Sequence, residues 1–181
     1  FLLPDGVTRL RIFEQRYLNM VKNEQQTNGF VISYCQNSPT SLPESQIAPW
    51  GSWVEIVNFM QGSDGILVID VKCKALVDIH ATSINFEQLM FGDVEVRPHW
   101  ADNLAQQSQS KLLVPLKKIF INNKNLADLY QQNFCDDNHW ICARWLELLP
   151  LPFADKSIFI CQDSYDKALK FLTEIISAKT I

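Results

Sequence analysis

The spacing of apolar residues changes once along this chain, from every second residue to every third or fourth. Residues 66–77 alternate apolar and polar side chains, which predicts a strand with one buried face and a wet face that carries Asp70, Lys72 and Lys74. After the polar stretch 101–110, apolar residues recur at helical spacing. The change predicts an α+β chain, with a β-rich part over residues 1–103 and a helical part over residues 104–181 packed on it.

The β-rich part is expected to be mostly antiparallel, with one early helix. Residues 2–6 (LLPDG) end an apolar stub with a turn, and a helix over residues 13–26 stops at Asn28-Gly29. Strands are predicted over residues 30–35, 53–60, 66–77 and 92–96, with a hairpin turn at residues 61–65. Residues 36–49 hold three prolines and several serines, the composition of a mobile loop.

Three helices are expected in the second part, over residues 112–120, 138–149 and 164–176. Ser164 is a natural N-cap for the last of them, and Pro150 ends the one before. The S-x-x-K string from Ser164 to Lys167 is therefore interpreted as a helix start rather than as a nucleophile beside an amine.

The charge balance argues against nucleic acid as a partner. The 181 residues carry 16 Lys and Arg against 20 Asp and Glu, a formal net charge of −4, whereas nucleic-acid affinity comes mostly from cations that neutralise phosphates. No apolar run approaches the roughly 20 residues that span a bilayer. We expect a soluble, cytoplasmic protein without a membrane partner.

The cysteines and glycines point away from cofactor chemistry. Five cysteines without dense spacing predict reduced thiols. Cys135, His139 and Cys142 share a helical face, but a fourth zinc ligand is missing nearby, so they are interpreted as core residues. None of the six glycines precedes a lysine, and the motifs GxGxxG, HExxH and GxSxG are absent. The sequence therefore predicts neither an enzyme nor a cofactor or metal site.

Aromatic residues are the remaining candidates for a binding surface. The chain has five tryptophans, and their large apolar surfaces usually belong to a core. A few of them along a groove would instead contact polypeptide.

Several strings, taken in order, resemble the N-terminal domain of Lon proteases and its stand-alone relatives. The first is LRIFEQRYLNMV at residues 10–21, preceded by LLPDG. It is followed by FVIS, GSWVEIVNFMQGSDGILVIDVKC and GDVEVRP, and then by WICARWLELLPLP, which is similar to the family's helical WxxxRLxELLPLP segment. The resemblance covers nearly the whole chain.

This resemblance implies a PUA-like β-barrel followed by a helical bundle. In full-length Lon proteases such a domain recognises substrate, while ATP hydrolysis and peptide cleavage lie in later domains. The implied role is non-catalytic binding of unfolded or exposed apolar polypeptide. A separate protease or ATPase is a further expected partner.

The first motif is expected to be structural, with Phe13 and Tyr17 packing the helix start against the barrel. Arg11, Glu14 and Arg16 would pair at its rim. The apolar strand that the family carries before LLP does not precede Leu2 here. We therefore expect that one barrel edge could be unpaired, and an unpaired edge can accept an extended peptide.

Three functions are ranked. Polypeptide binding comes first, and we expect its contacts at Trp50, Trp53 and Trp100. RNA binding comes second, because PUA-like barrels of other families bind structured RNA. A hydrolase that uses Cys135, His139 or Ser164 comes third.

Overall fold

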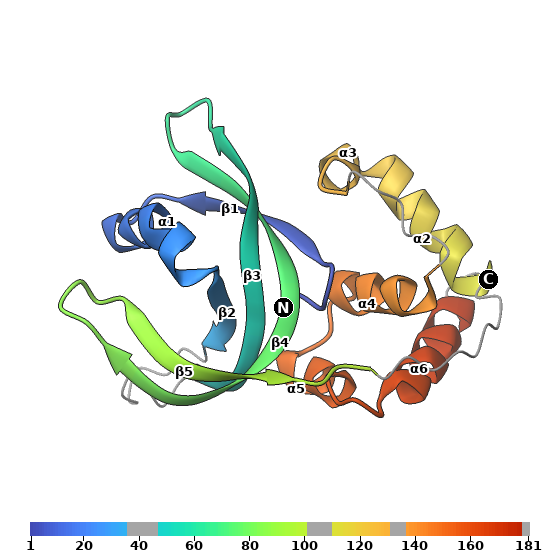
Figure 1. Ribbon diagram of the computed structural model, residues 1–181. Helices are drawn as coiled ribbons and strands as arrows, with labels where there is room; N and C mark the ends of the chain where they lie inside the picture. The colour runs from blue at the N-terminus through green and yellow to red at the C-terminus, as the bar shows by residue number, and fades with distance from the viewer. Residues whose placement is uncertain (36–46, 101–109, 131–136, 179–181) are drawn as a thin grey trace. The chain divides into compact units, whose positions relative to one another are not determined.

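The computed structural model describes residues 1–35, 47–100, 110–130 and 137–178. The chain forms two compact units, Phe1–Arg97 and Pro98–Ile181 (Figure 1). The first unit contains an antiparallel sheet and one helix, and the second unit contains helices, which confirms the predicted α+β class. The predicted boundary at residues 103 and 104 and most of the predicted loop at 36–49 lie outside the described residues.

Strand β4 (Leu67–Ile84) organises the first unit, because three of the other strands pair with it. One edge of β4 carries β3 (Ile47–Gln61). Its other edge carries first β1 (Val7–Ile12) and then β5 (Met90–Arg97), and its 18 residues are long enough for both. The strand β2 (Phe30–Cys35) pairs with β3, and all four pairings are antiparallel.

The four predicted strands are present, and three of them run further than the sequence pattern indicated. Strand β1 was not predicted. Its alternation of Leu10 and Ile12 with arginines is short and runs directly into the helix motif. Among the described residues no recorded pairing closes the sheet, so the barrel stays a prediction.

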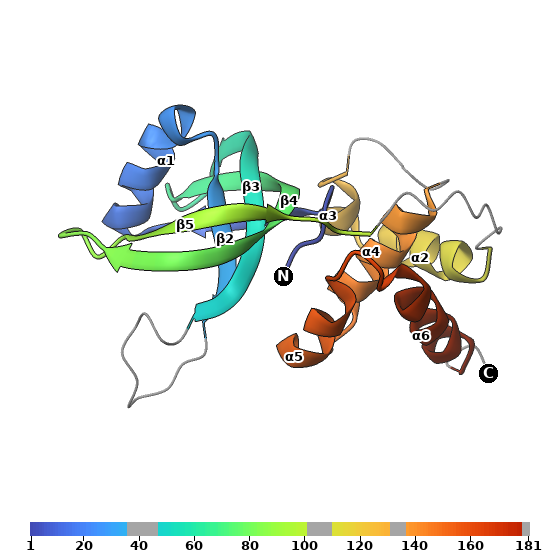
Figure 2. The same ribbon diagram turned by 60° about the horizontal axis from the view of Figure 1, so that its bottom comes forward.

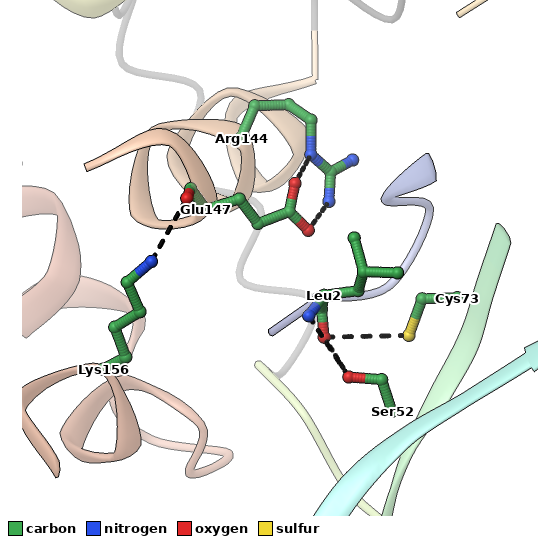
Figure 3. Close-up of polar contacts among 6 residues, drawn as sticks. All are labelled: Leu2, Ser52, Cys73, Arg144, Glu147 and Lys156. Atoms are coloured by element: carbon green, nitrogen blue, oxygen red, sulfur yellow. Dashed lines mark hydrogen bonds and ion pairs between the residues drawn. The ribbon is translucent and has the colours of Figure 1, made fainter. Parts of the chain in front are cut away.

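The segment before β1 is anchored inside the first unit (Figure 3). Leu2 and Leu3 are buried. The buried Ser52 hydroxyl donates to the Leu2 carbonyl at 2.6 Å and accepts from the Leu2 N–H at 3.3 Å. Asp5 adopts a positive φ of 63°, and its N–H donates to the Cys73 carbonyl at 2.9 Å. The predicted turn therefore fixes the entry into β1.

Helix α1 (Gln15–Thr27) ends as the sequence predicts, and Figure 2 shows it beside the strands of its unit. Asn28 and Gly29 have φ angles of 57° and 111°. A Cβ on Gly29 would lie 2.2 Å from the carbonyl oxygen of Val54. Glycine is thus required here both by backbone conformation and by close approach.

Asp70 corrects the predicted wet face of β4, because its carboxylate is buried. It accepts Arg9 Nε at 2.7 Å and Nη2 at 3.0 Å from β1, and Asn58 Nδ2 at 3.1 Å from β3. The Arg9 hydrogen bonds hold the pKa of Asp70 below its ordinary 3.8, although burial opposes them. Lys72 is half-buried and Lys74 is exposed, so the predicted face is wet only towards one end.

The second unit contains the three predicted helices. They are α2 (Ser110–Asn122), α4 (Asn138–Leu148) and α6 (Tyr165–Ala178). Three short turns of helix were not predicted, because they are too short for an apolar period: α3 (Lys124–Ala127), α5 (Phe153–Lys156) and η2 (Ser157–Phe159). Within the described ranges, no helix combines the length and apolar character needed to cross a membrane.

A buried ion pair lies inside the second unit (Figure 3). Arg144 is 1% exposed, and its Nε and Nη2 donate to the two carboxylate oxygens of Glu147 at 2.7 and 2.8 Å. Lys156 Nζ donates to the Glu147 carbonyl at 3.1 Å. Arg144 and Glu147 both belong to the string WICARWLELLPLP, so this motif supplies polar contacts as well as apolar ones.

Candidate functional site

Trp50 and Trp53 belong to β3 but differ in access. Trp50 is 4% exposed, and the Phe1 ring meets it edge-on at 5.7 Å. Trp53 is half-buried, donates from Nε1 to the Asn28 carbonyl at 3.1 Å, and carries Lys74 Nζ at 4.7 Å from its ring centre. The buried Trp50 does not offer a contact surface, whereas Trp53 remains a candidate.

Trp100 belongs to the core of the second unit. It is 6% exposed, and its Nε1 donates to the Phe159 carbonyl at 3.1 Å and to Ser164 Oγ at 3.2 Å. The His99 ring stacks on it at 4.3 Å, and the Tyr165 ring meets it at 5.3 Å. The expectation that Trp100 contacts a polypeptide is therefore not supported, because this indole is buried and hydrogen-bonded within its own unit.

The charged residues of the first motif form ion pairs, one of them with a residue outside the motif. Arg11 donates to Asp64 in the β3–β4 turn, and Arg16 lies 2.8 Å from Glu14. Arg16 also donates from Nη1 to the Gln88 carbonyl at 2.9 Å, and its guanidinium lies 4.7 Å from the ring centre of Tyr17. These contacts tie α1 to the connection between β4 and β5.

Phe13 corrects the expectation that it packs the helix start against the sheet. It lies between β1 and α1 and is 70% exposed. Its apolar spacing matched a helix that in fact begins two residues later, at Gln15. Tyr17 is half-buried, so the expected packing fits Tyr17 better than Phe13.

Ser164 and His139, two of the three residues ranked for a hydrolase, and the neighbouring Cys142 make contacts within the second unit. Ser164 precedes α6, and its hydroxyl donates to the Cys161 carbonyl at 2.6 Å, while Lys167 is exposed. Burial raises the pKa of the Cys142 thiol to about 12, and a protonated thiol is a poor nucleophile. His139 packs edge-on against the Tyr165 ring at 4.3 Å. These side chains contribute to packing and hydrogen bonding within the helical unit.

The parts of the chain that the structure describes contain no cluster of three His, Cys, Asp or Glu side chains suited to a metal ion. Cys135, which the sequence placed on one helical face with His139 and Cys142, lies outside the described residues. Asp137 instead caps α4, accepting from the N–H groups of His139 and Trp140 at 2.8 and 3.3 Å.

The first unit carries exposed apolar side chains, most of which sequence reasoning did not single out. The large ones are Phe13, Tyr34, Val57, Phe59, Phe86, Phe91, Val94 and Val96. Half of them lie in the connection after β4 and in β5: Phe86, Phe91, Val94 and Val96. The string GDVEV at residues 92–96 predicted a strand, but its alternation does not reveal that both faces are exposed.

Comparisons with known proteins agree on one family. The family model described as the ATP-dependent protease La (LON) substrate-binding domain matches residues 1–178. The crystal structure of a Lon N-terminal domain protein from Xanthomonas campestris is similar with a TM-score of 0.66 and 23% identity, over 94% of this chain and 90% of that one.

The N-terminal domain of the Mycobacterium avium complex Lon protease is similar with a TM-score of 0.64 and 12% identity, over 97% of this chain and 92% of that one. No curated protein matches the sequence. At these identities the two structures show the fold, and the family model covers nearly every residue. The chain belongs to the LON substrate-binding domain family.

Proposed function

We propose that this chain is a non-catalytic module that binds unfolded or exposed apolar polypeptide, in a substrate-recognition or adaptor role. The match of residues 1–178 to a LON substrate-binding domain is the observation that carries this proposal. The exposed apolar side chains of the first unit support it. No cofactor enters the proposal, and a separate protease or ATPase would act on what is bound.

The finer features predicted from the resemblance belong to the same proposal. They are closure of the sheet into a PUA-like barrel and a cytoplasmic location. The cysteines that the structure describes form no disulfide, as is usual in a reducing compartment. The net charge of −4 disfavours RNA, because phosphates would be repelled rather than neutralised.

Fluorescence anisotropy of a labelled unfolded polypeptide, such as reduced and alkylated lactalbumin, tests the proposal. We expect saturable binding that persists at high salt, because apolar contacts are not screened by ions. Absence of binding at both low and high salt would refute it. Binding of RNA that falls steeply with salt, without polypeptide binding, would favour the alternative.

Trp53 is the remaining aromatic contact candidate. Trp53→Ala is expected to weaken polypeptide binding if the exposed part of the indole contributes to it. Trp50→Phe serves as the comparison, because it changes a buried indole and should affect stability rather than affinity. Unchanged affinity in the Trp53 variant would remove this residue from the binding surface.

A further inference from the structure

The outer edge of β5 has the features of an open strand edge. Among the described strands, β5 pairs with β4 alone, and in Figure 2 it runs along the front of its unit. In an antiparallel ladder, every second residue of an edge strand directs its N–H and C=O away from the sheet. Residues 91–96 are all exposed, as is expected of residues on a strand edge that other described strands do not cover.

The side chains of β5 place two valines on one face, and two carboxylates with Phe91 and Arg97 on the other. Val94 and Val96 lie two residues apart and therefore share one face, while Asp93 and Glu95 share the other. Val96 is opposite Val77 and Glu95 is opposite Asp78 in the β4–β5 pairing. An extended segment placed along this edge would meet Val94 and Val96 on one face, and on the other the carboxylates of Asp93 and Glu95 after Phe91.

The hairpin over residues 78–97 concentrates the negative charge of the chain. It contains four acidic residues against one arginine, a formal charge of −3 out of −4 for the whole chain. Arg97, its cation, already pairs with Asp78. The exposed carboxylates of Asp93 and Glu95 therefore favour an occupant with basic side chains.

The same charges disfavour a second copy of this chain. Two β5 strands paired antiparallel would bring Asp93 of one copy near Glu95 of the other. Like charges opposite one another destabilise a strand pair. The occupant that fits is a strand of different composition.

The hairpin is held in place before any partner arrives. Asn85 Oδ1 accepts the N–H groups of Glu87 and Leu89 at 3.0 and 2.9 Å, which orders the connection between β4 and β5. Arg16 from α1 donates to the Gln88 carbonyl at 2.9 Å, and Asn19 donates to Glu87 Oε1 at 3.0 Å. Preorganisation of this kind lowers the entropy cost of binding.

We propose that β5 binds an extended polypeptide segment by strand addition, and that the segment alternates apolar and basic side chains. This inference rests on the proposed function and assigns it a site and a substrate class. Backbone hydrogen bonds would provide affinity that is independent of sequence. Val94 and Val96, together with Asp93 and Glu95, would select the side-chain pattern.

The test uses the whole chain and a labelled peptide of alternating lysine and valine, about as long as β5. The double variant Asp93→Lys with Glu95→Lys is expected to bind it about tenfold more weakly, and to gain affinity for an alternating glutamate–valine peptide. Asp155→Lys with Asp163→Lys is the control, because it changes the net charge equally at exposed positions of the other unit.

Two further arms separate backbone and apolar contributions. A lysine–valine peptide N-methylated at alternate residues keeps its charge but loses backbone donors, and we expect its affinity to fall at least about tenfold. Val94→Thr with Val96→Thr should weaken binding, whereas Val57→Thr at an exposed position of β3 should not. Circular dichroism checks that each variant is folded.

The outcomes distinguish the two proposals. Loss of peptide binding in the β5 variants and with the N-methylated peptide supports strand addition. Equal binding of unfolded lactalbumin and of the peptide by wild type and β5 variants overturns this inference while the proposed function stands. Failure of wild type to bind any polypeptide overturns both.

Discussion

Arg144 and Glu147 lie three residues apart on α4 and form a two-bond ion pair inside the helical unit. A buried charge is strongly destabilising when its partner is removed, although the intact pair adds little net stability. The pair therefore makes the unit sensitive to loss of either residue.

Glu147→Gln is expected to lower the free energy of unfolding by about 3 kcal/mol, because the Arg144 guanidinium keeps its charge and loses its counterion. Urea denaturation followed by far-UV circular dichroism measures the change. Glu174→Gln, at an exposed position of α6, should have almost no effect. Replacing both members by Met and Leu should recover most of the loss, and a double variant as unstable as Glu147→Gln would contradict this explanation.

His99 is expected to make stability fall in mildly acidic solution. Its burial lowers its pKa from 6.5 to about 4, and the nearby His139 and Arg144 act in the same direction. Since the unfolded chain takes up the proton more readily, the contribution is complete above pH 6.5. It is lost as the pH falls towards 4, by an amount on the order of 3 kcal/mol.

His99→Phe should flatten this part of the stability profile, measured by urea denaturation at a series of pH values. His80→Gln is the matched control, because His80 is more than half exposed. A profile with the same slope in wild type and His99→Phe would show that another group is responsible.

Asp70 is expected to make the stability of the first unit depend on pH, in a more acidic range than His99. Its folded-state pKa lies below 3.8, so its contribution is present above that pH and is lost as the pH falls through the folded value. Asp70→Asn should remove this dependence and cost about 2 kcal/mol at neutral pH. Hydrogen exchange of the β1 and β4 amides measures it, and Asp93→Asn, which is exposed, should leave the exchange unchanged.

Gly29 and Gly65 form a matched pair for separating backbone strain from steric overlap. Both have positive φ angles, of 111° and 80°, but a Cβ at Gly65 would meet nothing within 4 Å. Gly65→Ala is expected to cost about 1 kcal/mol through strain. Gly29→Ala should cost clearly more, because the new methyl group overlaps the Val54 carbonyl. Equal melting-temperature shifts for the two variants would contradict this assignment.

Local periodicity predicted most elements of both units, because the pattern that indicates a strand or a helix involves residues close in sequence. It could not predict that Asp70 is buried, because the arginine that pairs with it lies 61 positions away on β1. The same limit applies to Trp50 and Trp100, whose burial depends on contacts with Phe1 and with Phe159. The open edge of β5 follows from the order of the strands in the sheet. The apolar pattern of one strand does not reveal that order.

The position of β1 in the sheet has a consequence for the order of folding. Strands β3, β4 and β5 are joined by short connections, whereas β1 pairs with β4 only after a long intervening segment has been placed. Contacts between distant residues form slowly because the loop between them must first close. We therefore expect β1, although it is synthesised before the other strands, to join the sheet last. Substitutions at Leu10 or Ile12 would then accelerate unfolding while leaving the folding rate nearly unchanged.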